Sequence, residues 1–217
     1  MVPEHWGIER LKHSVESLKN GVWGSEPQMD NKDMPCVRIA DFDRNALRVI
    51  LEEQIIRNVP HLESCGHALS RRDLVLDKSG GGEEQPVSCV VLFDDSSPAV
   101  CLSFLARMSV ASGMSSSYWR YVHAVAYTAR VNPKPIKQTS GIQNLDSAQY
   151  LDELTAFPPL PEQHTIAERL DADTARIEGI IADAEKTIAL LRESHTAVIS
   201  DAVTAKIDVR ERHKEDA

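Results

Sequence analysis

The last quarter of the chain carries hydrophobic residues at helical spacing, from about residue 162 to residue 205. Residues three and four positions apart lie on one face of a helix, so this pattern predicts one long amphipathic helix. If Leu170 occupies position d of a heptad, every later d position up to Val198 is also apolar. We therefore expect a coiled-coil seam on this helix. Its expected members are Leu170, Ile177, Ile181, Ala184, Ile188, Leu191 and Val198.

A helix of roughly forty residues is about 60 Å long, which is too long to bury its seam against one small domain. The expected seam therefore needs a partner helix, and alanine within the seam suits a close, antiparallel approach. The other interpretation is a surface helix that packs on its own domain. Pro161 suits the first position of the helix, where the missing N–H is not needed.

Shorter elements precede this helix, and short runs of β-branched and apolar residues among them predict strands. The expected strands are residues 36–40, 74–77 and 87–93, the expected helices are part of 7–18 and 116–129, and the expected turns are 41–44, 78–82 and 132–146. Together these elements predict an α/β (α+β) fold, in which a mixed domain with an irregular sheet is followed by one long coiled-coil helix. Prolines at 158 and 159 mark the boundary between the two regions.

Composition and charge limit the classes of function that the chain could have. The chain is 42% hydrophobic and 26% charged, as ordinary globular proteins are. Its net charge of −9 argues against indiscriminate binding to nucleic acid. The segment from Ser96 to Leu145, however, contains no Asp or Glu and carries several Arg and Lys residues. This segment is either a face turned toward phosphates or a buried run of strand and helix.

Membrane insertion, secretion and catalysis find little support in the sequence. No apolar run reaches the length of about 18 residues that a membrane span needs, and the N-terminus lacks the pattern of a signal peptide, so we expect a cytoplasmic protein. The four cysteines have no framework spacing, which favours buried, reduced thiols. Residues 61–67 hold possible metal ligands, but no second ligand pair completes a site. No P-loop, GxGxxG, HExxH or GxSxG motif is present, so we expect no cofactor, metal or catalytic residue; a Cys–His nucleophile pair is the remaining enzymatic alternative.

Several motifs resemble one known family. The sequence PPLPEQ at 158–163, then IAERLD at 166–171, then a heptad helix that closes in ISDAVT at 199–204, resembles the conserved region of type I restriction–modification specificity subunits. Three upstream segments are similar to the target-recognition domains of that family. They are WGS at 23–25 with VRIADF at 37–42, DLVLDKSGGG at 73–82, and KQTSGIQNL at 137–145. The resemblance covers about residues 6–209.

The resemblance implies a non-catalytic subunit. It implies a DNA target-recognition domain at 1–157, a conserved helical spacer and dimerisation region at 158–209, and a flexible tail at 210–217. Family members read a split site in double-stranded DNA and serve as the platform for methyltransferase (modification) subunits and, through them, for a restriction subunit. They carry two copies of each region, whereas this chain carries one. Self-association of two chains through antiparallel helices is therefore implied, and a truncated subunit that needs another half is the alternative.

Polar residues in loops and at strand ends are the ones free to reach DNA. Guanine is commonly read by Arg, and adenine by Asn or Gln. The expected base contacts are Arg38, Asp41, Arg44, Gln143 and Asn144, and the expected phosphate contacts are Lys78, Arg120, Lys137, Thr139 and Ser140. Each of these residues also has a structural interpretation; Arg38, for example, suits an internal ion pair. Trp23 and Trp119 are expected in the core rather than against DNA.

A second function also fits the sequence. The chain would then be a coiled-coil interaction or regulatory protein whose recognition domain no longer binds DNA. The net charge of −9 supports this alternative.

Overall fold

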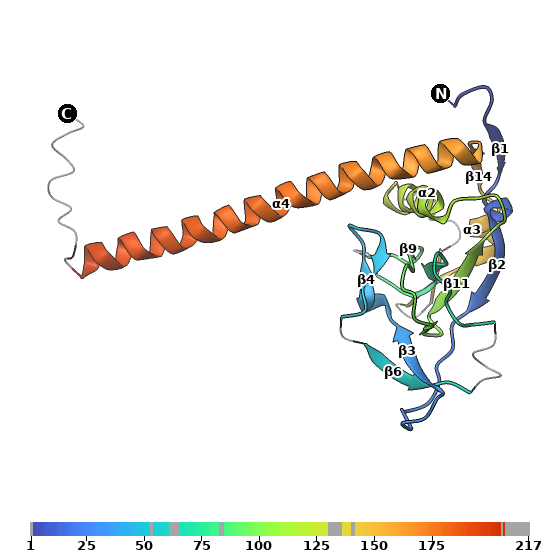
Figure 1. Ribbon diagram of the computed structural model, residues 1–217, viewed down its shortest axis with the longest axis horizontal. Helices are drawn as coiled ribbons and strands as arrows, with labels where there is room; N and C mark the ends of the chain where they lie inside the picture. Colours follow the sequence, from blue (N-terminus) through green and yellow to red (C-terminus); the bar gives the residue numbers. More distant parts are fainter. Residues whose placement is uncertain are drawn as a thin grey trace. The chain divides into compact units, whose positions relative to one another are not determined.

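The computed structural model describes residues 2–52, 54–60, 66–82, 85–129, 136–139, 142–204 and 206, and only the backbone of 137–139 (Figure 1). The chain divides into two compact units, Met1–Arg169 and Leu170–Ala217. No helix among the described residues is both long and apolar enough to cross a membrane.

A six-stranded sheet lies at the centre of the first unit, in the order β2-β11-β7-β9-β5-β4. Its strands are β2 (Val15–Asn20), β11 (Leu105–Val110), β7 (Leu74–Asp77), β9 (Val90–Leu92), β5 (Arg48–Val49) and β4 (Phe42–Asp43). Successive side chains of a strand point to opposite faces. Leu74 and Leu76 accordingly enter one hydrophobic cluster and Val75 enters another, and all three are fully buried. The sheet therefore has a core on each face.

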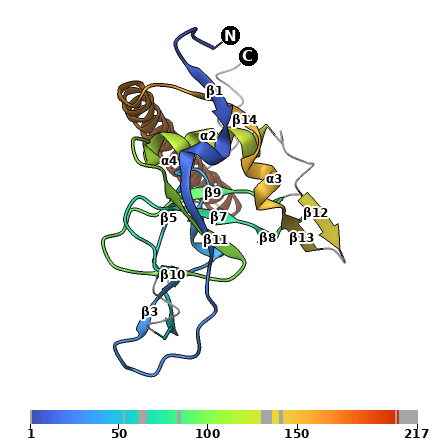
Figure 2. The ribbon, with the colours of Figure 1, turned by 90° about the vertical axis from the view of Figure 1, so that its right-hand side faces the viewer.

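Three smaller sheets complete the strand structure. One has the order β10-β3-β6, with β10 at Val100–Cys101, β3 at Asp33–Val37 and β6 at Ile55–Asn58. A second has the order β12-β13-β8, with β12 at Ile136–Thr139, β13 at Ile142–Leu145 and β8 at Ser79–Gly80 (Figure 2). The third pairs β1 (Gly7–Arg10) with β14 (Leu154–Phe157).

Helix α2 (Ser116–Thr128) covers one face of the central sheet. Trp119 on this helix is fully buried, packs with Leu74 and Leu76, and lies 4.7 Å from Phe157 between ring centroids. His123 on the same helix is also fully buried, and burial lowers its pKa to about 3, so the imidazole is neutral. His123 Nδ1 and the Tyr150 hydroxyl share a hydrogen bond of 2.5 Å that joins α2 to the short helix α3 (Ser147–Leu151).

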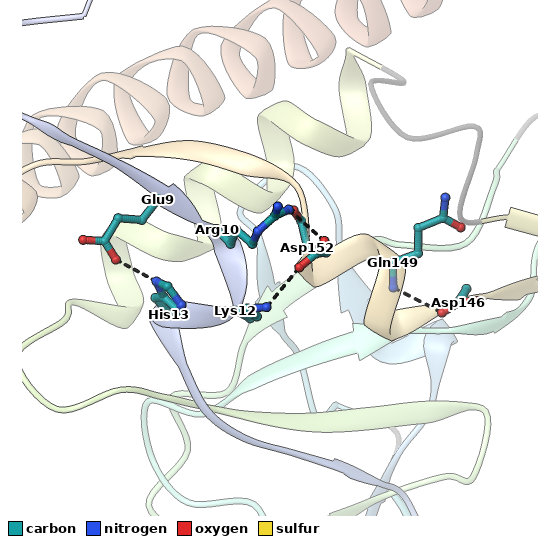
Figure 3. A network of polar contacts seen from close by, with 7 residues as sticks. All are labelled: Glu9, Arg10, Lys12, His13, Asp146, Gln149 and Asp152. Carbon is teal, nitrogen blue, oxygen red and sulfur yellow. Dashed lines mark hydrogen bonds and ion pairs between the residues drawn. The ribbon is translucent and has the colours of Figure 1, made fainter.

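A polar network fastens the N-terminal segment to the end of α3 (Figure 3). The carboxylate of Asp152 accepts hydrogen bonds from Arg10 Nη1 at 2.7 Å and from Lys12 Nζ at 3.0 Å. The Lys12 hydrogen bond is the main cause that lowers the pKa of Asp152. These pairs are half exposed, and exposed ion pairs contribute little free energy, so β1–β14 pairing and burial of Leu11 stabilise the attachment more.

The long helix is α4 (Leu160–Val203), a continuous helix of 44 residues. At a rise of about 1.5 Å per residue its length is about 66 Å. It begins at Leu160, so Pro161 occupies the second helical position rather than the first, still within the turn whose N–H groups lack helical partners. The boundary expected at 157/158 falls between β14 and α4, and the expected tail at 210–217 lies outside the described residues.

The predicted strands and helices agree with the structure at 74–77 and 116–128, and the strand predicted at 87–93 is shorter, at 90–92. The strand predicted at 36–40 is displaced to 33–37. Two turn predictions are wrong. Residues 79–80 form β8, and 136–139 with 142–145 form a hairpin inside the segment predicted as turns. Backbone pairing within the hairpin, and between β13 and the distant β8, stabilises these strands despite their polar sequence. The segment 41–44, predicted as a polar loop, begins at the last residue of the 3-10 helix η2 (Ile39–Asp41) and includes the short strand β4.

Candidate nucleic-acid interface

The sheet β12-β13-β8 joins two segments that lie far apart in the sequence and that both carry expected DNA contacts. Lys137 lies opposite Asn144 in the β12–β13 hairpin, and Asn144 lies opposite Ser79 in the β13–β8 pair. Lys78 immediately precedes β8, and its carbonyl oxygen accepts a hydrogen bond of 2.8 Å from Leu145 N. The backbone thus brings four expected contacts, Lys137, Thr139, Gln143 and Asn144, onto one small sheet, and it places Lys78 next to that sheet. Ser140 lies outside the described residues.

Gln143 and Asn144 are adjacent in β13 and have different environments. Gln143 is 7% exposed, and its Oε1 accepts a hydrogen bond of 3.3 Å from the backbone N of Val87. Asn144 is exposed, and its Oδ1 accepts a hydrogen bond of 2.6 Å from Ser79 Oγ. Base contact by Gln143 therefore does not fit this structure, since its side chain supports the adjoining loop. Asn144 is the better placed of the two to present its amide to a base edge.

Arg38 and Asp41 bind each other rather than facing outward. Arg38 Nη2 donates to Asp41 Oδ1 at 2.7 Å, and the Arg38 backbone N donates to Asp41 Oδ2 at 2.7 Å. This arrangement caps η2, and Asp41 is buried. The internal ion pair considered for Arg38 is therefore present, and base contact by Asp41 would require this pair to open.

Arg44 lies against the end of α2. Its Nη1 donates to the Tyr127 hydroxyl at 2.8 Å, and its guanidinium carbon lies 5.6 Å from the centroid of the Tyr127 ring. Nearby, the carboxyl group of Asp77 at the end of β7 is fully buried. Burial raises the pKa of Asp77 to about 7, and the Arg44 charge and the Ser79 amide offset only part of that rise. Arg44 is half-buried beside this acid, so its charge acts partly inside the domain.

Replacing Asp77 by Asn is expected to remove a pH dependence of folding. The folded pKa of about 7 lies above the unfolded value of 3.8, so the folded state binds the proton more tightly. Stability from this group is complete below pH 4 and is lost as the pH rises toward 7. We expect Asp77→Asn to exceed the wild type in free energy of unfolding by about 4 kcal/mol at pH 8 and to come close to it near pH 4. Urea unfolding at both pH values checks this; equal stability at pH 8 would contradict the buried-acid assignment.

The expected phosphate contact of Arg120 does not fit the structure. Arg120 is 1% exposed, because it lies on the face of α2 that packs into the domain. Its guanidinium carbon lies 4.8 Å from the Tyr121 ring centroid, and Nη2 donates to the Tyr121 hydroxyl at 3.3 Å. A guanidinium in this position lies inside the domain and does not meet solvent.

The two tryptophans predicted in the core differ in burial. Trp119 is fully buried, as predicted, but Trp23 is 53% exposed, so the prediction for Trp23 is wrong. Phe104 lies beside Trp23 and is 52% exposed. This exposure could not be predicted from the sequence, because a single aromatic residue in a glycine-flanked loop carries no periodic pattern.

The Pro-Pro-Leu-Pro-Glu-Gln segment attaches the start of α4 to the first unit. Gln163 is 1% exposed. Its Oε1 accepts a hydrogen bond of 2.9 Å from Ser115 N, and its Nε2 donates to the Pro158 carbonyl at 2.9 Å. Glu162 accepts hydrogen bonds from Trp6 Nε1 at 2.9 Å and from His5 Nε2 at 2.7 Å, and these bonds lower the pKa of Glu162. The motif therefore has a structural role at this joint.

The expected seam of α4 is not buried within the chain. Its large hydrophobic members are between 36% exposed, at Leu170, and 64% exposed, at Leu191. An apolar stripe left in water on a long helix is typical of a surface that pairs with another chain.

Comparison with known proteins identifies this architecture. The chain is 24% identical over 196 residues to the type I restriction enzyme EcoBI specificity subunit of Escherichia coli. This alignment covers 89% of this chain and 38% of that protein. The HsdS subunit of Thermoanaerobacter tengcongensis superposes with a TM-score of 0.58 at 16% identity, over 93% of this chain and 46% of that chain. A chain from a structure of the type I R-M system gives a TM-score of 0.66 at 16% identity and the same coverage. This chain has the fold of a type I specificity subunit.

The specificity-subunit fold confirms the family resemblance and the mixed α/β class predicted from the sequence. The chain spans 38% of the length of the Escherichia coli relative and 46% of the HsdS chain, so it matches less than half of each. No model of a known protein family matches the chain.

Three cysteines of the described region, Cys36, Cys89 and Cys101, are free and buried. Burial raises the pKa of Cys36 and of Cys89 to about 11 and that of Cys101 to about 12, so all three thiols are protonated at neutral pH. No group of three or more His, Cys, Asp or Glu residues suited to a metal occurs among the described residues. The ligands considered at 61–65 lie outside them.

Proposed function

We propose that the chain recognises a specific DNA sequence, without itself catalysing a reaction, as the recognition subunit of a type I restriction–modification complex. The observation that carries this proposal is the superposition of 93% of the chain on an HsdS subunit. The sheet β12-β13-β8 supports it, because it holds an exposed amide at Asn144 beside the lysine positions 78 and 137. An amide can read adenine, and lysine can position phosphates.

The partners that follow from this role are double-stranded DNA, methyltransferase (modification) subunits and, through them, a restriction subunit. One matching structure concerns complex assembly in a type I R-M system. We place the protein in the cytoplasm, where such a complex would meet its DNA.

We further propose that two copies of the chain associate through antiparallel α4 helices. The exposed seam supports this, because an identical helix offers the same apolar stripe, and two-fold pairing satisfies both. The dimer would place one recognition unit at each half of a split, palindromic DNA site. Pairing with a different half-subunit is the alternative. The molecular mass of the purified chain in solution distinguishes the two, because only self-association gives a dimer of this chain alone.

The second candidate function is a coiled-coil interaction protein that no longer binds DNA. The net charge of −9 favours it, since phosphate binding needs positive charge. Methylome sequencing of cells with and without the gene decides between the two. The recognition role predicts that one split motif loses its methylation, and an unchanged methylome would count against it.

Charge reversal at Lys78 and Lys137 together is expected to weaken DNA binding and reduce its salt dependence. Each lost phosphate contact lowers the slope of log K against log salt by about 0.9, so we expect a slope shallower by about one to two. The affinity of the purified complex for a target duplex, measured at several salt concentrations, checks this. Lys186→Glu, an exposed reversal on α4, is the control and should keep the wild-type slope. Unchanged binding in the double variant would favour the second candidate function.

A further inference from the structure

Two large aromatic side chains lie side by side at the surface of the first unit. Trp23 and Phe104 are 53% and 52% exposed, and their rings meet edge to face, with centroids 6.2 Å apart and planes at 89°. Aromatic rings contribute much of the free energy of cores and interfaces when buried. A pair that remains in water therefore marks a surface built for contact.

The backbone fixes these two rings relative to each other. The Trp23 loop hydrogen-bonds to the β10–β11 segment, through Val22 N to Cys101 O at 2.8 Å and Gly21 N to Leu105 O at 2.9 Å. A Cβ at Gly21 would lie 2.2 Å from Cys101 O, so only glycine permits this approach. The loop that presents Trp23 and the turn that presents Phe104 are thus packed backbone to backbone.

Arg57 in β6 also contacts Trp23. Its guanidinium carbon lies 5.4 Å from the centroid of the Trp23 ring, and its Nε donates to the Trp23 carbonyl at 3.2 Å. The Arg57 side chain is 14% exposed and forms an ion pair with Glu26, which offsets its charge. Trp23 is therefore supported by a cation–π contact and by a fixed loop, and little conformational entropy remains to be lost when it binds.

The aromatic pair is continuous with the sheet assigned to DNA. The carbonyl oxygen of Phe104 accepts a hydrogen bond of 3.2 Å from the backbone N of Lys78, and Lys78 leads directly into β8. The β8 strand pairs with β13, which carries Asn144. Phe104 also belongs to the segment without Asp or Glu between residues 96 and 145. This segment therefore supplies no carboxylate beside Phe104, and the exposed carboxylate on the Trp23 side, that of Glu26, is paired with Arg57.

We propose that Trp23, supported by Phe104, is an apolar wedge that packs against a base step of the target DNA. The proposal rests on the DNA-recognition function above. Rigid apolar side chains can unstack a base step and deform the duplex, and aromatic faces stack on any base. Trp23 would thus add affinity and local deformation beside the bases that the polar residues read, without a hydrogen bond of its own.

The test uses the full chain with its modification subunit and a duplex that carries the motif found by methylome sequencing, with 2-aminopurine at successive positions. Trp23→Ala is expected to weaken binding about tenfold to a hundredfold, with an unchanged salt slope because the indole releases no counterions. One 2-aminopurine position should brighten with the wild type and stay dark with Trp23→Ala. Trp23→Phe should restore part of both signals. Leu154→Ala, which truncates another exposed apolar residue, is the control.

Phe104→Ala should lose part of the affinity for the duplex. If Trp23→Ala melts at a lower temperature than the wild type, Phe104→Ala replaces it as the variant that tests the proposal. Wild-type affinity and wild-type 2-aminopurine fluorescence in both alanine variants would overturn the wedge while leaving DNA recognition intact. Loss of assembly with the modification subunit at unchanged DNA affinity would overturn it too, in favour of a protein-docking surface. A wild type that binds no duplex would instead refute the proposed function.

Discussion

The double substitution Ile188→Asp and Leu191→Asp is expected to convert a dimer of this chain into a monomer. The two residues occupy neighbouring a and d positions of the α4 seam and are 49% and 64% exposed in the single chain. In an antiparallel pair they would be buried, and an unpaired carboxylate costs several kcal/mol when it leaves water. Since both chains carry both substitutions, we expect the dissociation constant to rise more than a hundredfold.

Light scattering on a gel-filtration column at micromolar concentration measures this change in mass. The chain supplies a matched control, because Leu190 is adjacent, similarly exposed at 58% and lies off the seam. Leu190→Asp with Ala189→Asp has nearly the same cost in helix propensity but leaves the seam intact, so it should remain a dimer. A monomeric wild type would contradict self-association, and equal disruption by both pairs of substitutions would contradict the assigned seam.

Gln163→Leu is expected to lower the free energy of unfolding by about 3–5 kcal/mol, because it leaves two buried backbone groups without a partner. Those groups are the Ser115 N–H and the Pro158 carbonyl, and Gln163 bonds to each at 2.9 Å. Leucine has similar volume, so the loss comes from the hydrogen bonds rather than from a cavity.

Urea unfolding followed by circular dichroism measures this effect. Gln149→Leu is the control, because Gln149 is exposed on α3 and the same substitution there should change stability by less than about 0.5 kcal/mol. A Gln163→Leu variant as stable as this control would show that the joint does not depend on the amide.

The features predicted best from the sequence were those that local periodicity encodes. The long helix α4 carries apolar residues at helical spacing over many turns, and the buried strand 74–77 is a short, almost wholly apolar run. The β12–β13–β8 sheet was predicted as turns because its strands are short and polar, and β8 depends on pairing with residues of β13 that lie more than sixty positions away. Periodicity within a window does not report such pairing.

The expected DNA contacts show the same limit. The expected contacts were selected because their side chains can bind bases or phosphates. The structure shows that these residues differ in exposure: Asn144 is exposed, whereas Arg120 and Gln143 are buried. The segment without acids likewise has two kinds of environment, since half of β11 and one face of α2 are buried in the core, while Phe104 and Asn144 face solvent. A sequence cannot separate these cases, because which face of an element is buried depends on what packs against it.

The attachment formed by Gln163 affects which parts of the chain can change independently during evolution. Both partners of the Gln163 amide at 2.9 Å are main-chain atoms, the Ser115 N–H and the Pro158 carbonyl. Main-chain atoms are present whatever side chains the neighbouring segments carry. Substitutions on the β12-β13-β8 sheet leave these two hydrogen bonds unchanged. Under the proposed function, the residues that read DNA can therefore change during evolution while the start of α4 keeps the same attachment.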